Sequence, residues 1–212
     1  MVEIILKIFI SYLLGSLMGG LVLGKLTGSS DIRETGSKSA GATNALRTHG
    51  KAFGAGVFAI DIAKGLLAVI LIAPYHSGES VQQWMTLDML QVWCGLAAVA
   101  GHLYPVFFGF RGGKGVATLL GAMFGISPVV LLVALGGWVV ILLLTGYVSV
   151  ASMGAGIVAA VFAIFWLPGW GASPVGIFTI ISAVLLVYTH RSNIKRLRDG
   201  SEHRFNVLGR FK

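Results

Sequence analysis

Residues 105–118 read PVFFGFRGGKGVAT, a short cationic turn that lies between two apolar runs. Gly112, Gly113 and Gly115 carry no Cβ, so their backbone N–H groups can approach an anion closely. Lys114 adds a positive charge at the same place. The pattern predicts a phosphate-binding turn at a membrane surface. The alternative is a flexible turn whose cations only follow membrane topology.

The residues after the turn support an anion site without making it a nucleotide-binding motif. From Val116 onward the sequence predicts a helix, and helix N-termini favour anions. A Walker A loop needs four residues between its first glycine and Gly-Lys, followed by Ser or Thr. Here Phe108 stands five positions before Gly113, and Gly115 follows the lysine. The turn is therefore not a Walker A loop.

The composition indicates an integral membrane protein. Of 212 residues, 56% are hydrophobic and 11% are charged, and the mean hydropathy is +0.85; soluble domains carry roughly 25% charged residues. The first apolar run lacks a basic leader and a small-residue cleavage site, so we expect a span rather than a signal peptide. The single cysteine, Cys94, excludes an intrachain disulfide and a cysteine-based metal site. Without repeats or linkers, residues 1–212 are predicted to form a single domain.

The net charge of +8 is distributed in a way that argues against nucleic-acid binding. Apolar runs separate three basic segments, as the positive-inside rule requires. The cations of these segments are Lys25, Arg33, Lys38, Arg47 and Lys51; Arg111 and Lys114; and Arg191, Lys195, Arg196, Arg198, Arg204, Arg210 and Lys212.

We predict an all-α protein with seven transmembrane helices. A span needs about 20 apolar residues, and one helix over residues 115–144 would run about 45 Å, too long for one crossing. A break at Ser127-Pro128 solves this and puts all three basic segments on one side, with the N-terminus outside and the C-terminus cytoplasmic. The predicted spans are 4–24, 53–73, 89–107, 115–126, 129–144, 148–167 and 174–189.

Two further segments on the cytoplasmic side carry candidate ligand groups. Residues 36–47 combine glycines, hydroxyls, an amide and the Arg47 guanidinium, which suits a phosphate and polyol ligand; the alternative is a capped interfacial turn. In the last segment, His190 and Asn193 are three residues apart, on one face of a helix that continues from the seventh span. The alternatives are a structural histidine and a basic tail that binds anionic headgroups.

Other polar residues in apolar surroundings have simpler explanations. Ser149 can reach a ligand from the turn at 145–149, but hydroxyls in membrane helices more often bond to backbone. Asp61 and Lys64 lie one helical turn apart inside the second span and can neutralise each other as a structural pair. His102 precedes the glycine turn and is expected to brace it.

Together these segments resemble the acyl-phosphate:glycerol-3-phosphate acyltransferase family (PlsY) of bacterial membranes, over nearly the whole chain. The resemblance rests on residues 101–118, Gly41-Ala-Thr-Asn44 with Arg47, Gly146-Tyr-Val-Ser149, and 190–197 with Gly200-Ser-Glu202. The family has Gly-Ser-Gly-Asn where this chain has Gly36-Ser-Lys-Ser39. Whether position 39 contacts a ligand is therefore open.

The resemblance implies an enzyme that transfers a fatty acyl group from acyl phosphate to the sn-1 hydroxyl of glycerol 3-phosphate. It implies a monomer in the bacterial cytoplasmic (inner) membrane, surrounded by membrane lipids, with three cytoplasmic motif loops forming the active site. No cofactor and no metal ion is expected. The alternatives are a transporter or channel for phosphorylated anions and a non-catalytic scaffold.

The residues that we assign to this reaction match the family's motifs. The catalytic candidates are Ser37, Arg47, Lys114, His190 and Asn193, and the substrate- or phosphate-binding candidates are Gly36, Gly41, Ala42, Thr43, Asn44, Gly112, Gly113, Gly115, Ser149 and Glu202. We expect direct acyl transfer without an acyl-enzyme, since the sequence contains no Gly-x-Ser-x-Gly nucleophile motif and no His-x4-Asp dyad. The base is His190 or a phosphate oxygen of the donor.

Overall fold

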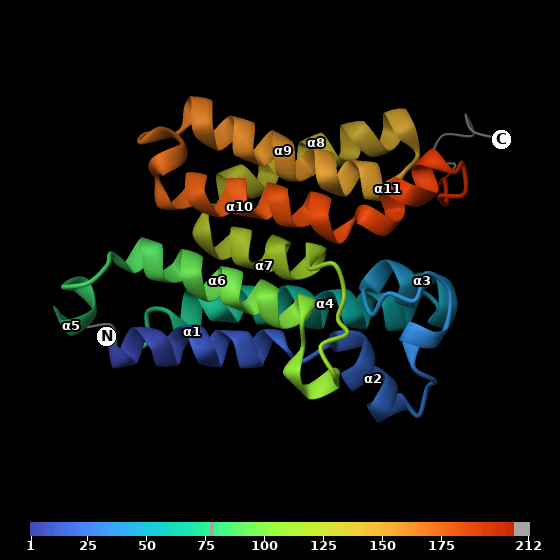
Figure 1. Cartoon of the computed structure of the whole chain (residues 1–212), viewed down its shortest axis with the longest axis horizontal. Coiled ribbons are helices and arrows are strands. Elements are labelled where there is room, and N and C mark those ends of the chain that lie inside the picture. Colours follow the sequence, from blue (N-terminus) through green and yellow to red (C-terminus); the bar gives the residue numbers. More distant parts are fainter. Residues whose placement is uncertain (77–78, 206–212) are drawn as a thin grey trace. The chain divides into compact units, whose positions relative to one another are not determined.

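The protein is described by a computed structural model that covers residues 1–76 and 79–205. Every regular element among these residues is a helix (Figure 1), as the sequence predicts. The chain divides into two compact units, Met1–Ile126 and Ser127–Lys212. That residues 1–212 work as a single functional domain stays a prediction. The predicted tail cations Arg210 and Lys212 lie outside the described residues.

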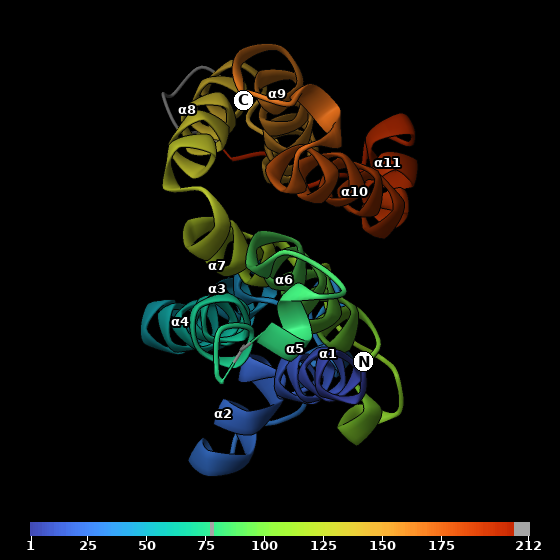
Figure 2. The same ribbon diagram turned by 90° about the vertical axis from the view of Figure 1, so that its left-hand side faces the viewer.

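Unit 1 is a bundle in which α6 packs between α1 and α7, and α4 packs against α7 (Figures 1 and 2). The short helix α2 packs on α4. The α-helices of unit 1 are α1 (Val2–Gly15), α2 (Gly19–Thr27), α3 (Ala42–His49), α4 (Lys51–Leu67), α5 (Glu79–Gln82), α6 (Leu87–Leu103) and α7 (Val116–Ile126). Three short elements complete it: the 3-10 turns η1 (Ile32–Glu34) and η3 (Val106–Phe108), and a π-helical extension of α4, η2 (Ala68–Ile72).

Unit 2 consists of α8 (Pro128–Thr145), α9 (Val148–Trp166), α10 (Pro174–Thr189) and α11 (Arg191–Arg198), with the 3-10 turn η4 (Trp170–Ala172) before α10. Helix α9 packs against both α8 and α10. The two long helices after breaks begin alike: a serine hydroxyl accepts a backbone N–H of the first turn, and proline takes the first helical position. Proline fits there because that N–H has no partner within the helix.

Four of the predicted spans correspond to helices long and apolar enough to cross a membrane: Lys51–Ile72, Leu87–Phe108, Pro128–Thr145 and Val148–Trp166. Helix α7 is apolar but shorter, as predicted, and it ends at the expected Ser127-Pro128 break. Two bent pairs of helices, α1 with α2 and α10 with α11, bring the number of candidate spans to six among the described residues. The count of seven and the orientation in the membrane stay predictions.

Two sequence-based predictions of continuous helices are wrong. Residues 4–24 do not form one helix, because Met18 is extended (φ −77°, ψ 112°) and α1 and α2 meet at 49°. The helix of the seventh span does not continue straight into the tail, because α10 and α11 meet at 53° at His190. At the second bend the His190 N–H still donates to the Leu186 carbonyl, so the backbone bond across the junction is kept.

The break between α1 and α2 is stabilised by the buried Asp61–Lys64 ion pair of α4. The two charged groups lie 2.9 Å apart, and their side chains are 1% and 2% exposed. Lys64 Nζ donates to the Leu17 carbonyl at 3.0 Å, and Asp61 Oδ1 accepts the Gly19 N–H at 3.3 Å. The pair thus supplies the partners that an interrupted helix leaves without backbone bonds. This confirms the predicted structural pair and explains why the helix can break there.

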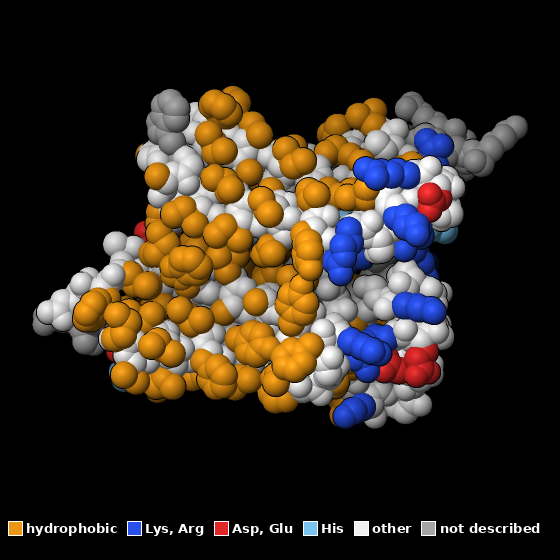
Figure 3. Space-filling model, viewed as in Figure 1, with side chains coloured by type: hydrophobic (Ala, Val, Ile, Leu, Met, Phe, Trp, Pro, Cys, Tyr) orange, Lys and Arg blue, Asp and Glu red, His pale blue; other side chains and the backbone are white. Residues whose placement is uncertain are grey.

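Each unit has an apolar flank and a polar end. In Figure 3, hydrophobic side chains cover most of the visible flank of each unit, and the Lys and Arg side chains gather at one end of its helices. In unit 1 this is the end of the glycine turn, because Arg33 of the first loop contacts the carbonyls of Phe108 and Arg111. This arrangement is typical of a protein whose helices lie in lipid and whose loops lie at its surface.

Helices α1 and α6 approach so closely that only glycine fits at two contact points. A Cβ on Gly15 would overlap the Ala98 carbonyl, and a Cβ on Gly101 would overlap the Tyr12 carbonyl. Small residues at such contacts let helices in membranes approach each other closely. By contrast, a Cβ on Gly136 of α8 would meet no heavy atom within 4 Å.

We expect Gly15→Ala to lower the thermal midpoint in detergent, because the added methyl must push α1 and α6 apart at a cost of about 1–3 kcal/mol. Gly136→Ala is the matched control. It should be neutral or stabilising by up to about 1 kcal/mol, since alanine is the better helix former. Equal midpoints for the two variants would contradict the close α1–α6 contact.

Candidate active site

The glycine turn between α6 and α7 is anchored at its start on the end of α1. Tyr12 donates its hydroxyl to the Tyr104 carbonyl at 2.7 Å, and Val106 N–H donates to Ser16 Oγ at 3.4 Å. Tyr104 ends α6 and η3 follows directly. The turn therefore leaves the bundle in a direction that α1 sets.

Inside the turn, the backbone takes conformations that favour glycine. Gly109 and Gly115 have φ of +66° and +81°, and Gly115 immediately precedes α7. Gly113 N–H donates to the His102 carbonyl at 3.1 Å, so this donor points into the protein rather than toward a ligand. The half-buried Lys114 follows it. An anion would then be bound by Lys114 together with amides of the turn other than that of Gly113.

The first loop is shaped around the side chain of Asn44. Its Nδ2 donates to the carbonyls of Ile32, Thr35 and Ser39 at 2.9, 3.0 and 3.0 Å, and its Oδ1 accepts the Ser37 N–H at 2.8 Å. The side chain is only 1% exposed. The structure therefore gives Asn44 a role in shaping the loop; direct binding of a ligand stays a prediction.

The remaining candidates of this loop lie in α3 or just before it. Gly41 is the N-cap, so the N–H groups of Ala42 and Thr43 belong to the first turn, where helices leave backbone donors without helical partners. Ser37 and Arg47 have exposed side chains. The helix itself was not predicted, because residues 42–49 are too few and too polar to give a helical pattern.

Lys38 stands where the family's Gly-Ser-Gly-Asn pattern has its second glycine, and its backbone conformation is one that glycine favours. Its φ is +57°, in the left-handed region, and Gly36 has φ +59°. A glycine adopts this conformation freely, whereas another residue is destabilised by about 1 kcal/mol. The loop thus keeps the backbone shape that a glycine would favour.

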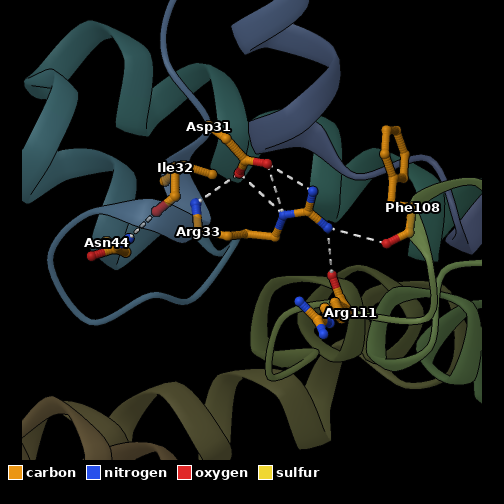
Figure 4. A network of polar contacts seen from close by, with 6 residues as sticks. All are labelled: Asp31, Ile32, Arg33, Asn44, Phe108 and Arg111. Carbon is orange, nitrogen blue, oxygen red and sulfur yellow. Dashed lines mark hydrogen bonds and ion pairs between the residues drawn. The ribbon is translucent and has the colours of Figure 1, made fainter.

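Arg33 connects the first loop to the glycine turn, as Figure 4 shows. Its Nη1 donates to the carbonyls of Phe108 and Arg111 at 3.1 and 3.3 Å. Its Nε and Nη2 bind Asp31, the shortest contact being 2.7 Å. Two of the three predicted motif loops are therefore in direct contact. The hydrogen bond from Arg33 holds the pKa of Asp31 below its usual value, although burial acts in the opposite direction.

Sequence reasoning missed the role of Asp31 and Arg33. The pair stands two residues apart in a loop, where an Asp accepting the N–H two residues on is a common turn motif. That signal predicts the local turn. It does not predict that the guanidinium reaches carbonyls 75 and 78 residues away.

In unit 2, His190 lies at the junction of α10 and α11 and is 3% exposed. Its Nδ1 is 2.8 Å from the Leu186 carbonyl. A carbonyl can only accept, so Nδ1 carries the proton and the neutral ring has its lone pair on Nε2. This is the tautomer that a base acting through Nε2 needs.

Glu202 joins three residues of unit 2. Its Oε1 accepts from Ser149 Oγ at 2.9 Å and from Asn193 Nδ2 at 2.7 Å, and its Oε2 accepts from Arg196 Nε at 2.7 Å. Burial alone would raise the pKa of Glu202, but the hydrogen bonds from Asn193, Arg196 and Ser149 outweigh it and the pKa is lowered. Ser149, Asn193 and Glu202, predicted separately, therefore form one cluster.

The segment after α11 docks on the turn between α8 and α9. Phe205 N–H donates to the Gly146 carbonyl at 2.8 Å, and Arg204 Nε donates to the Thr145 carbonyl at 3.0 Å while stacking near the Tyr147 ring. These contacts use main-chain carbonyls and a ring as partners, which leave no pattern in the sequence. Over the described ranges 1–76 and 79–205, no group of three or more His, Cys, Asp or Glu side chains is arranged to hold a metal ion.

Comparisons with known proteins agree with the architecture of both units. Residues 5–200 match the family model described as glycerol-3-phosphate acyltransferase. Proteins of that name from Aquifex aeolicus and Thermoanaerobacter pseudethanolicus are 44% and 42% identical, over 93% of this chain and 97% and 93% of their own lengths.

Two crystal structures of PlsY, an integral membrane glycerol 3-phosphate acyltransferase, are also similar to this chain. The glycerol 3-phosphate form gives a TM-score of 0.82 at 40% identity, covering 97% of each chain. The lysophosphatidic acid form gives 0.80 at 40% identity, covering 97% of this chain and 96% of the other.

We expect Glu202→Gln to lower the thermal midpoint near pH 7 by a few degrees, because two charge-assisted hydrogen bonds and one ion pair lose their charge. A carboxyl with a lowered pKa contributes stability above its unfolded pKa of about 4.3, which is lost as the pH falls through the folded value. The deficit of the variant should therefore shrink between about pH 5 and pH 3.

The control is Asp199→Asn, an exposed carboxyl beside the same cluster, which should leave the profile unchanged. A deficit of Glu202→Gln that stays constant down to pH 3 would show that the charge of Glu202 does not stabilise the cluster.

Proposed function

The chain belongs to the glycerol-3-phosphate acyltransferase family and is an acyltransferase, and we propose that it transfers a fatty acyl group from acyl phosphate to the sn-1 hydroxyl of glycerol 3-phosphate. The products are lysophosphatidic acid and inorganic phosphate. The observation that carries this proposal is the contact of two cationic, glycine-rich segments, the first loop and the glycine turn, through Arg33. Both substrates carry a phosphate group that such a surface can bind.

The first loop and the glycine turn would bind the two phosphates. Arg47 offers a guanidinium that fits phosphate oxygens in two-pronged fashion, and Ser37 of the same loop offers a hydroxyl, so these residues would hold glycerol 3-phosphate. Lys114 and neighbouring backbone N–H groups would stabilise the charge on the departing phosphate. Asn193 would contact the acceptor, its amide nitrogen being held by Glu202.

The reaction would be a direct displacement. The sn-1 oxygen attacks the acyl carbonyl, the bond from that carbon to the phosphate oxygen breaks, and the hydroxyl proton passes to a base. Two bases fit: His190, whose Nδ1 contact leaves a lone pair on Nε2, and a phosphate oxygen of the donor. Acyl phosphate is already activated, so positioning and charge stabilisation can supply most of the acceleration.

A covalent acyl-enzyme is not needed in this proposal. Cys94 is fully buried in α6 among residues of the bundle core, away from the glycine turn. The structure offers no support for the transporter alternative. The deep charges, Asp61 and Lys64, are engaged in the α1–α2 break rather than exposed to a translocated ion.

Localisation and assembly follow from the same proposal. We propose a monomer in the bacterial cytoplasmic membrane, with the substrates bound from the cytoplasmic side. The apolar flanks would contact membrane lipids (Figure 3). No cofactor is proposed, because acyl phosphate already carries an activated leaving group.

Purified protein given acyl phosphate and labelled glycerol 3-phosphate is expected to form labelled lysophosphatidic acid and one equivalent of phosphate. Acyl-CoA or acyl carrier protein should not replace the donor, and excess chelator should not change the rate. Transfer from acyl-CoA at a comparable rate would contradict the assignment of the donor. A labelled acylglycerol phosphate esterified at the second carbon would contradict the sn-1 assignment.

Lys114→Ala should lower kcat/KM by about 10- to 100-fold, the loss of one charge-assisted hydrogen bond of about 1.5–3 kcal/mol. Lys51→Ala, which removes an exposed cation at the start of α4, is the control and should retain near-normal kcat/KM. Near-normal activity of the Lys114 variant would remove this residue from the mechanism.

A further inference from the structure

The buried side chain of His102 lies between the α4 ion pair and the glycine turn. His102 is 2% exposed, and it belongs to the last turn of α6, just before the turn begins. On one side, its Nδ1 is 3.5 Å from Asp61 Oδ1. On the other side, its imidazole meets the main chain of Gly113. No step of the proposed acyl transfer uses either His102 or Asp61.

The contact with Gly113 is direct and tight. The three heavy atoms nearest to a Cβ placed on Gly113 are Nε2, Cδ2 and Cε1 of His102, and the nearest of them would overlap it. The backbone adds a second link, because Gly113 N–H donates to the His102 carbonyl at 3.1 Å. A Cβ on Gly112 would likewise overlap that carbonyl. Side chain and main chain of one residue therefore fix the path of Gly112 and Gly113.

Asp61 lies on the side of the imidazole ring opposite to Gly113 and orients the ring. Within the described part of the chain, His102 Nδ1 and Asp61 Oδ2 are both buried without a hydrogen-bond partner, and the carboxylate oxygen Oδ1 lies 3.5 Å from Nδ1. A proton on Nδ1 is attracted by the carboxylate, which favours the tautomer with Nε2 unprotonated and facing Gly113. Asp61 itself is fixed by Lys64 and by the Gly19 N–H.

We propose that His102 and Asp61 are positioning residues of the acyl transfer: Asp61 orients the imidazole, and the imidazole holds the Gly112–Gly113 backbone in the conformation in which Lys114 binds the donor phosphate. The kinetic part of this inference rests on the proposed function. The same ion pair that stabilises the α1–α2 break thereby also determines the shape of the phosphate turn.

The sharpest test is a double-mutant cycle of His102→Ala and Gly113→Ala. Alone, Gly113→Ala should lower kcat/KM by about 100-fold, because its methyl displaces the turn, and His102→Ala by about 10-fold. Removal of the imidazole makes room for the methyl, so the double variant should stay within about threefold of His102→Ala rather than fall about 1,000-fold. Additive losses would overturn the proposal.

The steady-state constants separate positioning from a general loss of structure. A variant that only folds poorly has less active protein, so its apparent kcat falls while its KM is unchanged. For His102→Ala and Asp61→Asn we expect instead an increase of about tenfold in the KM for acyl phosphate, with kcat within about threefold. An unchanged KM with a lower apparent kcat would assign both residues a purely structural role.

Lys7→Met is the matched control. Lys7 is also buried in α1, pairs with Glu3 at 2.8 Å and donates to the Ala73 carbonyl, remote from the glycine turn. This variant should lose thermal stability and keep the KM of the unmodified protein. A raised KM in Lys7→Met would show that any buried polar loss disturbs the turn, which would contradict the specific role of His102.

Amide hydrogen exchange provides a readout that does not depend on the reaction. His102→Ala and Asp61→Asn should increase the exchange of residues 109–115 in detergent, and Lys7→Met should not. If the unmodified protein failed to form lysophosphatidic acid, the proposed function would fall while this exchange pattern still supported the positioning contact. Unchanged exchange in both variants would overturn the inference.

Discussion

The structure of unit 1 depends on the ion pair between Asp61 and Lys64. In an apolar environment an interrupted helix is destabilised by its unpaired backbone groups, each by several kcal/mol. This pair supplies an acceptor for Gly19 and a donor for Leu17, so the first apolar run can bend by 49° between α1 and α2. Because each charge has the other as its partner, neither is left uncompensated in the interior.

The bend has consequences beyond α1 and α2. It lets α2 pack on α4 and directs the chain into the first loop. There Asn44 and Arg33 hold the backbone through hydrogen bonds to carbonyl groups. The end of α1 contacts the start of the glycine turn through Tyr12 and Ser16. One interruption of one helix thus brings the first loop and the glycine turn into the same region of unit 1.

The polar segments are organised by side chains that bind the protein itself. Arg33 uses its guanidinium on two carbonyls, Asn44 uses its amide on its own loop, and Glu202 uses both oxygens on neighbouring side chains. Satisfied polar networks of this kind are rigid, because loss of any one partner leaves a buried group without a bond. Such rigidity is what preorganised stabilisation of a charged transition state requires.

The sequence by itself determined the membrane class, the all-helical fold, four of the spans and the Ser127-Pro128 break. It also determined that a glycine-rich turn separates the third apolar run from the next one. These features follow from composition, apolar run length and proline chemistry, which act locally. Only the tertiary structure decided that residues 4–24 bend, that Arg33 reaches Phe108 and Arg111, that the 201–205 segment docks on the α8–α9 turn and that His102 touches Gly113. Each of these depends on a hydrogen bond or a close contact between residues from about ten to 75 or more positions apart, and no periodicity or motif in one chain encodes the partner of such a contact.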